Sequence, residues 1–147
     1  MFFIYRCLTF ILTPLFVLLT YCRLILKKED KLRYKEKIYA SSFNTERNNK
    51  KKLIWFHAAS IGEVLSILPL IEELNSINKN LEFLITTITL SSANLLKKKL
   101  IKFNNAKHRF FPLDTKNLSK KFLSKWKPNL VCFVDSEIWP NFLFEIK

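Results

Sequence analysis

Short apolar runs alternate with segments of helical periodicity throughout residues 53–147, and this alternation constrains the fold most. Residues 53–57, 82–86, 108–111 and 130–135 have the length and composition of strands buried on both faces. Between these runs, residues 62–77, 90–103 and 117–126 repeat apolar side chains at helical spacing. Strands and helices that alternate at this length form right-handed βαβ units around a parallel sheet. The sequence therefore predicts a Rossmann-like α/β layer.

A long apolar segment precedes this pattern. Residues 2–26 are interrupted only by Arg6 and Arg23. The stretch between the two arginines is 16 residues long, and about 20 are needed to span the hydrocarbon core of a bilayer. If both arginines snorkel outward the segment can span, and the alternative is a helix lying in the interface. A weaker alternative is a buried core helix. We therefore predict an apolar anchor helix over residues 1–27.

Basic residues follow the anchor. Residues 23–37 carry 7 basic and 3 acidic side chains, and lysines beside a membrane segment favour the cytoplasmic side and attract anionic head groups. Residues 40–52 are polar and without periodicity, as in a linker. We predict a basic juxtamembrane helix and linker over residues 28–52, an α/β domain over residues 53–147, and an anionic membrane surface as a partner.

Charge and composition exclude several kinds of site. The net charge of +13 comes from 20 lysines and only 5 arginines, whereas proteins that read base edges depend on the bidentate arginine fork. We therefore predict no nucleic-acid partner, with a salt-dependent DNA binder as the weakest alternative. The single glycine, Gly62, excludes glycine-rich phosphate loops. The chain has only three scattered cysteines and two histidines, so we predict that it binds no metal and no other cofactor.

Polar side chains follow each predicted strand, at the edge where ligands bind in open parallel sheets. Glu63 is the sharpest candidate for a general base, but Ser60 and Glu63 also match the S-x-x-E capping box of a helix. Asp135 and Glu137 follow the last strand. The alternative role of Asp135 is to cap a helix, and that of Glu137 is to place a negative charge in the first turn of that helix. The other candidates at this edge have structural alternatives too: His57 as a strand-end side chain and Asp114 as a cap.

The motifs at this edge resemble one family. Residues 57–63 read H-A-A-S-I-G-E, which is similar to the H-A-A-S-x-G-E signature of the 3-deoxy-D-manno-octulosonic acid (Kdo) transferases. Residues 136–141, S-E-I-W-P-N, match a second motif of that family in the same order. The resemblance extends over essentially the whole chain, through these further segments: 28–36, 86–89, 112–114 and 122–128.

The resemblance implies a fold, a reaction and site residues. Kdo transferases are inverting enzymes of the two-domain GT-B type that move Kdo from CMP-Kdo to the lipid A precursor, at the cytoplasmic side of the inner membrane. The family's base corresponds to Glu63, and its acidic pair, which is assigned to stabilising the transition state, corresponds to Asp135 and Glu137. We expect the acceptor-binding residues to be His57, Ser60, Gly62 and Thr87.

The sequence departs from the family at several positions, among them Ile88 and Lys31, and two departures bear on activity. The family commonly has glutamate where this chain has Asp135, so the carboxylate is carried on a side chain one methylene shorter. A GT-B enzyme also needs a second, donor-binding domain, and the length of 147 residues accommodates only the acceptor side. We therefore expect this chain to be inactive without a donor-binding half. The alternative is a non-catalytic, membrane-tethered lipid A-binding protein.

Overall fold

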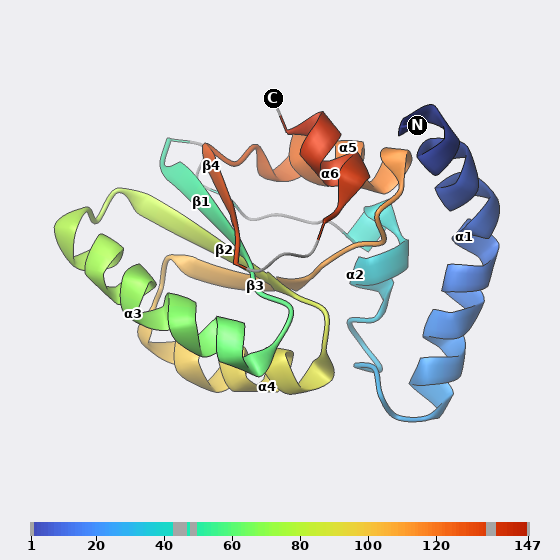
Figure 1. Cartoon of the computed structure of the whole chain (residues 1–147). Coiled ribbons are helices and arrows are strands. Elements are labelled where there is room, and N and C mark those ends of the chain that lie inside the picture. The colour runs from blue at the N-terminus through green and yellow to red at the C-terminus, as the bar shows by residue number, and fades with distance from the viewer. Residues whose placement is uncertain (1, 43–46, 48–49, 135–137, 147) are drawn as a thin grey trace. The chain divides into compact units, whose positions relative to one another are not determined.

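The computed structural model describes residues 2–42, 47, 50–134 and 138–146. The chain divides into two compact units. Unit 1 comprises residues 1–45, 112–126 and 138–147, and unit 2 comprises residues 46–111 and 127–137. The sheet belongs entirely to unit 2 (Figure 1).

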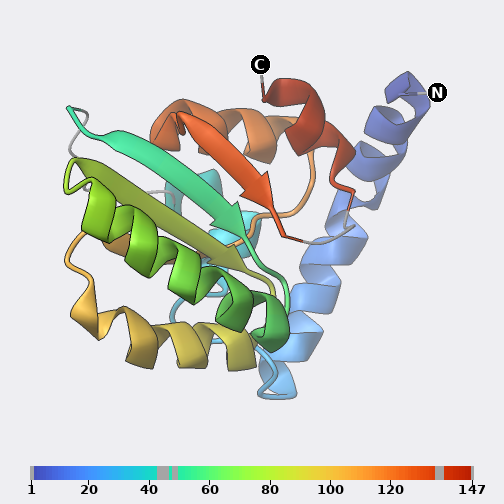
Figure 2. The same ribbon diagram turned by 60° about the vertical axis from the view of Figure 1, so that its left-hand side comes forward.

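Unit 2 is built on a parallel sheet of four strands in the order β3-β2-β1-β4. Helices α3 and α4 lie side by side along the sheet (Figure 2). The strands and helices of this unit are β1 (Lys52–His57), α3 (Ile61–Ile77), β2 (Leu81–Thr87), α4 (Leu90–Lys99), the 3-10 turn Leu100–Lys102, β3 (Ala106–Phe110) and β4 (Leu130–Phe133). The predicted α/β layer is confirmed.

The core of unit 2 consists of apolar side chains of β1 and β2 that pack with the apolar face of α3. Ile54 and Phe56 alternate along β1, Phe83 and Ile85 along β2, and these side chains pack with the apolar face of α3, including Ile71. β1 and β2 are buried nearly throughout, as predicted. β3 and β4 are half-exposed over most of their length because each has a neighbouring strand on one side only.

Unit 1 is helical and contains α1 (Phe2–Ile25), α2 (Lys35–Ile38), the 3-10 turn Ala40–Ser42, α5 (Lys116–Trp126) and α6 (Pro140–Glu145). The predicted apolar helix before the α/β layer is α1. Residues Phe3–Ile25 are long and apolar enough to cross a membrane, and 11% of an 18-residue apolar stretch within them is buried. Within the predicted basic segment 28–52, the helical part is short, because α2 is a single turn of 4 residues.

Candidate active site at the carboxyl edge of the sheet

The strand order places a topological switch point between β1 and β4. From β1 the chain builds outward through β2 to β3, and β4 then pairs with the opposite side of β1. In open parallel sheets, ligands bind beyond the carboxyl ends of the strands at such a point. Residues 58–63, which contain Glu63, leave this edge after β1, and Val134 follows β4 at the same edge.

Glu63 lies in the first turn of α3, where its carboxylate is fixed by the backbone. Its Oε2 accepts a hydrogen bond from the amide of Ala59 at 2.8 Å, and its Oε1 accepts one from the amide of Ser60 at 3.1 Å. Ser60 Oγ in turn accepts from the Glu63 amide at 3.3 Å. This is the complete capping box that the sequence allowed. The half-exposed Glu63 side chain is thereby oriented at the edge of the sheet.

His57 is buried at the carboxyl end of β1. Its Nδ1 lies 3.0 Å from Thr86 Oγ1, which also accepts a hydrogen bond from the indole of Trp55 at 2.8 Å. The imidazole packs 4.0 Å from the ring of Phe111, centroid to centroid. Burial lowers the pKa of His57 to about 4, against weaker opposing effects of Thr86 and Glu63. His57 is therefore neutral at physiological pH.

The ends of β2 and α4 complete this edge. Thr87 is fully buried, and its Oγ1 lies 2.9 Å from Nε2 of His108. Thr89 caps α4 by accepting from the amide of Ser92. The buried Ser92 hydroxyl donates to the carbonyl of Ala59 at 3.4 Å. This contact holds the start of α4 against the segment that carries Glu63.

Gly62 lies exposed in the first turn of α3. A Cβ atom at this position would meet only Ser60 Oγ, at 3.9 Å, which is an ordinary van der Waals distance. Packing of the chain against itself therefore does not require a glycine here. An approaching ligand is a physical reason for one, because glycine lets another group come close to the backbone.

The predicted acidic pair, Asp135 and Glu137, lies outside the described residues. The residue before it is described: the amide of Val134 donates to the carbonyl of His57 at 3.0 Å. The chain thus leaves β4 beside the carboxyl end of β1. The roles predicted for Asp135, Glu137, Glu63, Ser60, Gly62, His57 and Thr87 stay predictions.

Asp114 has a role that the sequence did not predict in full. It is a cap, as the alternative interpretation had it, but of α6 rather than of the helix that follows it. Its carboxylate accepts from the amides of Asn141 and Phe142 at 3.1 and 3.0 Å and from the hydroxyl of Tyr5 at 2.8 Å. Thr115 caps α5 instead. The carboxylate at position 114 indicated a cap. The sequence could not show which helix it caps, because the Asn141 amide lies 27 residues away.

No group of three His, Cys, Asp or Glu side chains within the described part of the chain is arranged to hold a metal ion. The arrangement at the sheet edge instead offers one oriented carboxylate and a neutral, buried imidazole. Such a site suits proton transfer and polar recognition of a ligand.

Comparison with known proteins identifies the family. Residues 32–147 match the N-terminal glycosyltransferase family described as 3-deoxy-D-manno-octulosonic-acid transferase (kdotransferase). Among curated proteins, a 3-deoxy-D-manno-octulosonic acid transferase of Rickettsia bellii is 37% identical over 97% of this chain and 33% of its own length. Similarly named proteins of Rickettsia conorii and Chlamydia pneumoniae are 42% and 33% identical, each over 65% of this chain and over 20% and 22% of their own lengths.

The chain spans about a third of the length of the relative from Rickettsia bellii. The family profile matches well over half of the chain, including the whole sheet and both motif segments, residues 57–63 and 136–141. The chain therefore belongs to the 3-deoxy-D-manno-octulosonic acid transferase family.

Proposed function

We propose that this chain is the acceptor-side half of an inverting glycosyltransferase that moves Kdo from CMP-Kdo to the lipid A precursor. The observation that carries the proposal is the position of the H-A-A-S-I-G-E segment. In a chain of this family, it leaves the sheet at the switch point between β1 and β4, beside the segment that leads into Asp135 and Glu137. We place this action at the cytoplasmic face of the inner membrane: the apolar helix α1 supports attachment to a membrane, and the basic residues after it favour the cytoplasmic side.

Glu63 is the proposed general base. The acceptor hydroxyl oxygen attacks the anomeric carbon of Kdo, its proton passes to the Glu63 carboxylate, and the bond from that carbon to the phosphate oxygen of CMP breaks. Each Glu63 oxygen accepts one backbone amide, and an ionised carboxylate has about four acceptor positions. The cap therefore leaves lone pairs for a substrate hydroxyl, so the two roles of Glu63 are compatible.

The acidic pair and the remaining edge residues complete the proposal. Asp135 and Glu137 stabilise the charge that develops in the transition state, and Ser60 and Gly62 lie where the acceptor approaches the start of α3. His57 and Thr87 are buried, so in this proposal they support the acceptor-binding edge from beneath. The donor-binding half is supplied by the region that corresponds to the remaining two thirds of the relatives.

The test joins residues 1–147 to that remaining region of the Rickettsia bellii relative and measures Kdo transfer to a lipid A precursor. Glu63→Gln is the decisive variant, because glutamine can keep the bond from the Ser60 amide in the S-x-x-E/Q capping box, at the loss of the bond from Ala59, and removes the base. We expect at least about a 100-fold loss of kcat. The matched control is Glu73→Gln, an exposed position on the same helix, which should stay within about twofold of the parent rate.

Three outcomes separate the proposals. Near-normal transfer by Glu63→Gln would reduce Glu63 to a helix cap. Turnover by residues 1–147 alone would overturn the requirement for a donor-binding half. Binding of lipid A without transfer by the fused protein would favour a non-catalytic lipid A-binding protein.

A further inference from the structure

The polarity of α1 is the reverse of that of a surface helix in a water-soluble protein. Its buried positions include Thr9 and Thr20, whose hydroxyls donate to carbonyls of the helix itself, to Tyr5 O at 3.0 Å and to Phe16 O at 2.9 Å. Its exposed side chains are mostly large and apolar: Phe3, Ile4, Leu8, Phe10, Ile11, Leu15, Leu18, Leu19 and Ile25. The charged Arg23, near its end, is exposed as well. A helix on a water-soluble domain buries its apolar stripe, so the outer face of α1 is suited to lipid.

Polar contacts hold α1 to the rest of unit 1 near both of its ends. Near its start, Tyr5 donates to Asp114 and Arg6 forms an ion pair with Glu145 at 2.5 Å. Near its end, Arg23 forms an ion pair with Glu29 at 2.7 Å. These anchor points are roughly 25 Å apart at 1.5 Å per residue. A helix that crossed the bilayer would carry one of these charged contacts into or across the hydrocarbon, whereas a helix lying in the interface keeps both near water.

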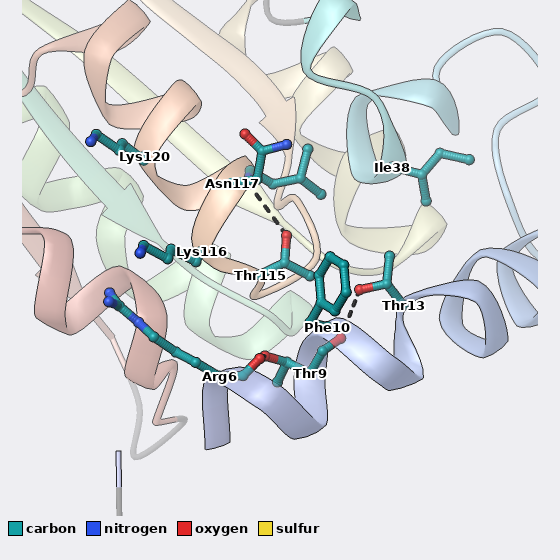
Figure 3. Close-up of a pocket in the computed structure, with 10 residues that line it drawn as sticks. Arg6, Thr9, Phe10, Thr13, Ile38, Thr115, Lys116, Asn117 and Lys120 are labelled. Atoms are coloured by element: carbon teal, nitrogen blue, oxygen red, sulfur yellow. Dashed lines mark hydrogen bonds between the residues drawn. The ribbon is translucent and has the colours of Figure 1, made fainter. Parts of the chain in front are cut away.

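A groove lies beside the first half of α1, between α1, Ile38 and α5 (Figure 3). Its volume is about 430 Å³. Phe10, Ile38 and Leu118 supply apolar surface, and the exposed residues Lys116 and Lys120, one helical turn apart, supply positive charge. The described residues that line the groove include no carboxylate. Phe10 is 80% exposed and also belongs to the apolar outer face of α1, so the groove is continuous with that face.

We propose that this groove binds one anionic phospholipid of the bilayer, with its phosphate at Lys116 and Lys120 and an acyl chain against Phe10 and along α1. Charge complementarity selects an anion, and the apolar wall selects a lipid over free phosphate. The proposal rests on the membrane location in the proposed function. All of the groove residues belong to unit 1, and none of them is among the residues assigned to the site around Glu63.

The experiment measures binding of the 147-residue chain to short-chain phosphatidylglycerol, short-chain phosphatidylcholine and inorganic phosphate, each below its aggregation limit. The first variant is Lys116→Gln with Lys120→Gln, and its matched control removes the same charge from exposed positions on α4, Lys97→Gln with Lys98→Gln. A second pair separates the shape of the groove from charge: Thr13→Phe fills the groove, and Leu19→Phe adds bulk to the exposed face of α1.

We expect phosphatidylglycerol to bind on the order of 10- to 30-fold more weakly to the double lysine variant, from the loss of two cations near a phosphate. Thr13→Phe should also weaken it at least tenfold, and both controls should bind as the parent does. Circular dichroism verifies that each variant folds. Equal loss in the α4 control, or equal binding of inorganic phosphate and phosphatidylglycerol, would overturn the proposal. Kdo transfer is not a readout here, so failure of this test leaves the proposed reaction untouched.

Discussion

The two units of the chain are stabilised by different kinds of burial. Unit 2 has an apolar core that includes Ile54, Phe83 and Ile85. Unit 1 contains all of the buried acidic and lysine side chains of the described residues: Glu29, Glu36, Lys37 and Asp114. Apolar burial is non-directional and tolerates small shifts, whereas buried charge is costly unless every hydrogen bond is made. Unit 2 should therefore respond to loss of volume, and unit 1 to loss of single polar atoms.

The largest expected effect is a cavity in unit 2. Phe83 is 1% exposed at the centre of β2, and Phe83→Ala should lower the free energy of unfolding by about 3–5 kcal/mol. Urea unfolding followed by the fluorescence of Trp55 and the other tryptophans measures it. Ile77→Ala, at a position 73% exposed at the end of α3, should cost less than about 0.5 kcal/mol. Similar losses in the two variants would mean that the apolar core does not dominate unit 2.

The next effect is a pH dependence that arises within unit 2. The pKa of buried His57 is about 4 in the folded chain and about 6.5 in an unfolded one. Below pH 6.5 the unfolded state binds a proton that the folded state does not, so stability is complete above pH 6.5 and falls as the pH approaches 4. The loss should be roughly 3 kcal/mol.

Carboxylates also titrate near pH 4, so the contribution of His57 to the pH dependence is measured as a difference in stability between two proteins. Urea midpoints at pH 7, 5.5 and 4.5 are compared between the parent chain and His57→Gln. The variant should be less stable at pH 7 and should show a flatter decline between pH 6.5 and 4.5. Parallel declines in the two proteins would show that His57 is not the group responsible.

A smaller and more local effect is expected in unit 1. Asp114→Asn keeps the size of the side chain but replaces one acceptor oxygen of the α6 cap by an amide that cannot accept. One backbone N–H at Asn141 or Phe142 then loses its partner, at a cost of about 1–3 kcal/mol. Hydrogen exchange should show α6 losing protection while β1 and β2 keep theirs.

Asp30→Asn is the matched control for that variant, because Asp30 also accepts from backbone amides, at Leu32 and Arg33, in a more exposed turn. Its effect should be about 0.5–1 kcal/mol. If Asp114→Asn lowered protection uniformly across β1, β2 and α6, the two units would unfold as one, and the contrast between them would not extend to cooperativity.

The same contrast explains what could be predicted from the sequence. The strands and helices of unit 2 lie within one or two residues of most predicted boundaries, because apolar periodicity reports directly on burial. The capping box at Ser60 and Glu63 was also predictable, because its partners are 3 residues apart. The assignment of Glu63 as a base came from the family motif, since the capping pattern alone favours a structural role.

The polar contacts of unit 1 could not be predicted in this way. Tyr5 and Asp114 are 109 residues apart in sequence, and no local period connects them. The basic segment 23–37 was predicted to attract anionic head groups, yet its Lys37 is buried and forms an ion pair with Glu29 at 2.6 Å. Composition reports the charge of a segment but not which charges pair, because pairing is decided by tertiary structure.

The smallest expected effect on stability is that of Gly62→Ala, which should raise the stability of the chain and lower the activity of the fused enzyme. Glycine in a helix is less stable than alanine by about 0.5–1 kcal/mol, and a Cβ atom here would meet only Ser60 Oγ, at 3.9 Å. Gly62→Ala should therefore raise the free energy of unfolding by up to about 1 kcal/mol. If an acceptor approaches this backbone, the same methyl group should lower kcat/KM of the fused enzyme about tenfold or more.

The control variant is Ser66→Ala, at an exposed position in the same helix. It should change neither the free energy of unfolding nor kcat/KM by much. A more stable Gly62→Ala enzyme with unchanged kcat/KM would place the acceptor away from the start of α3, while a less stable one would show that the glycine serves the fold.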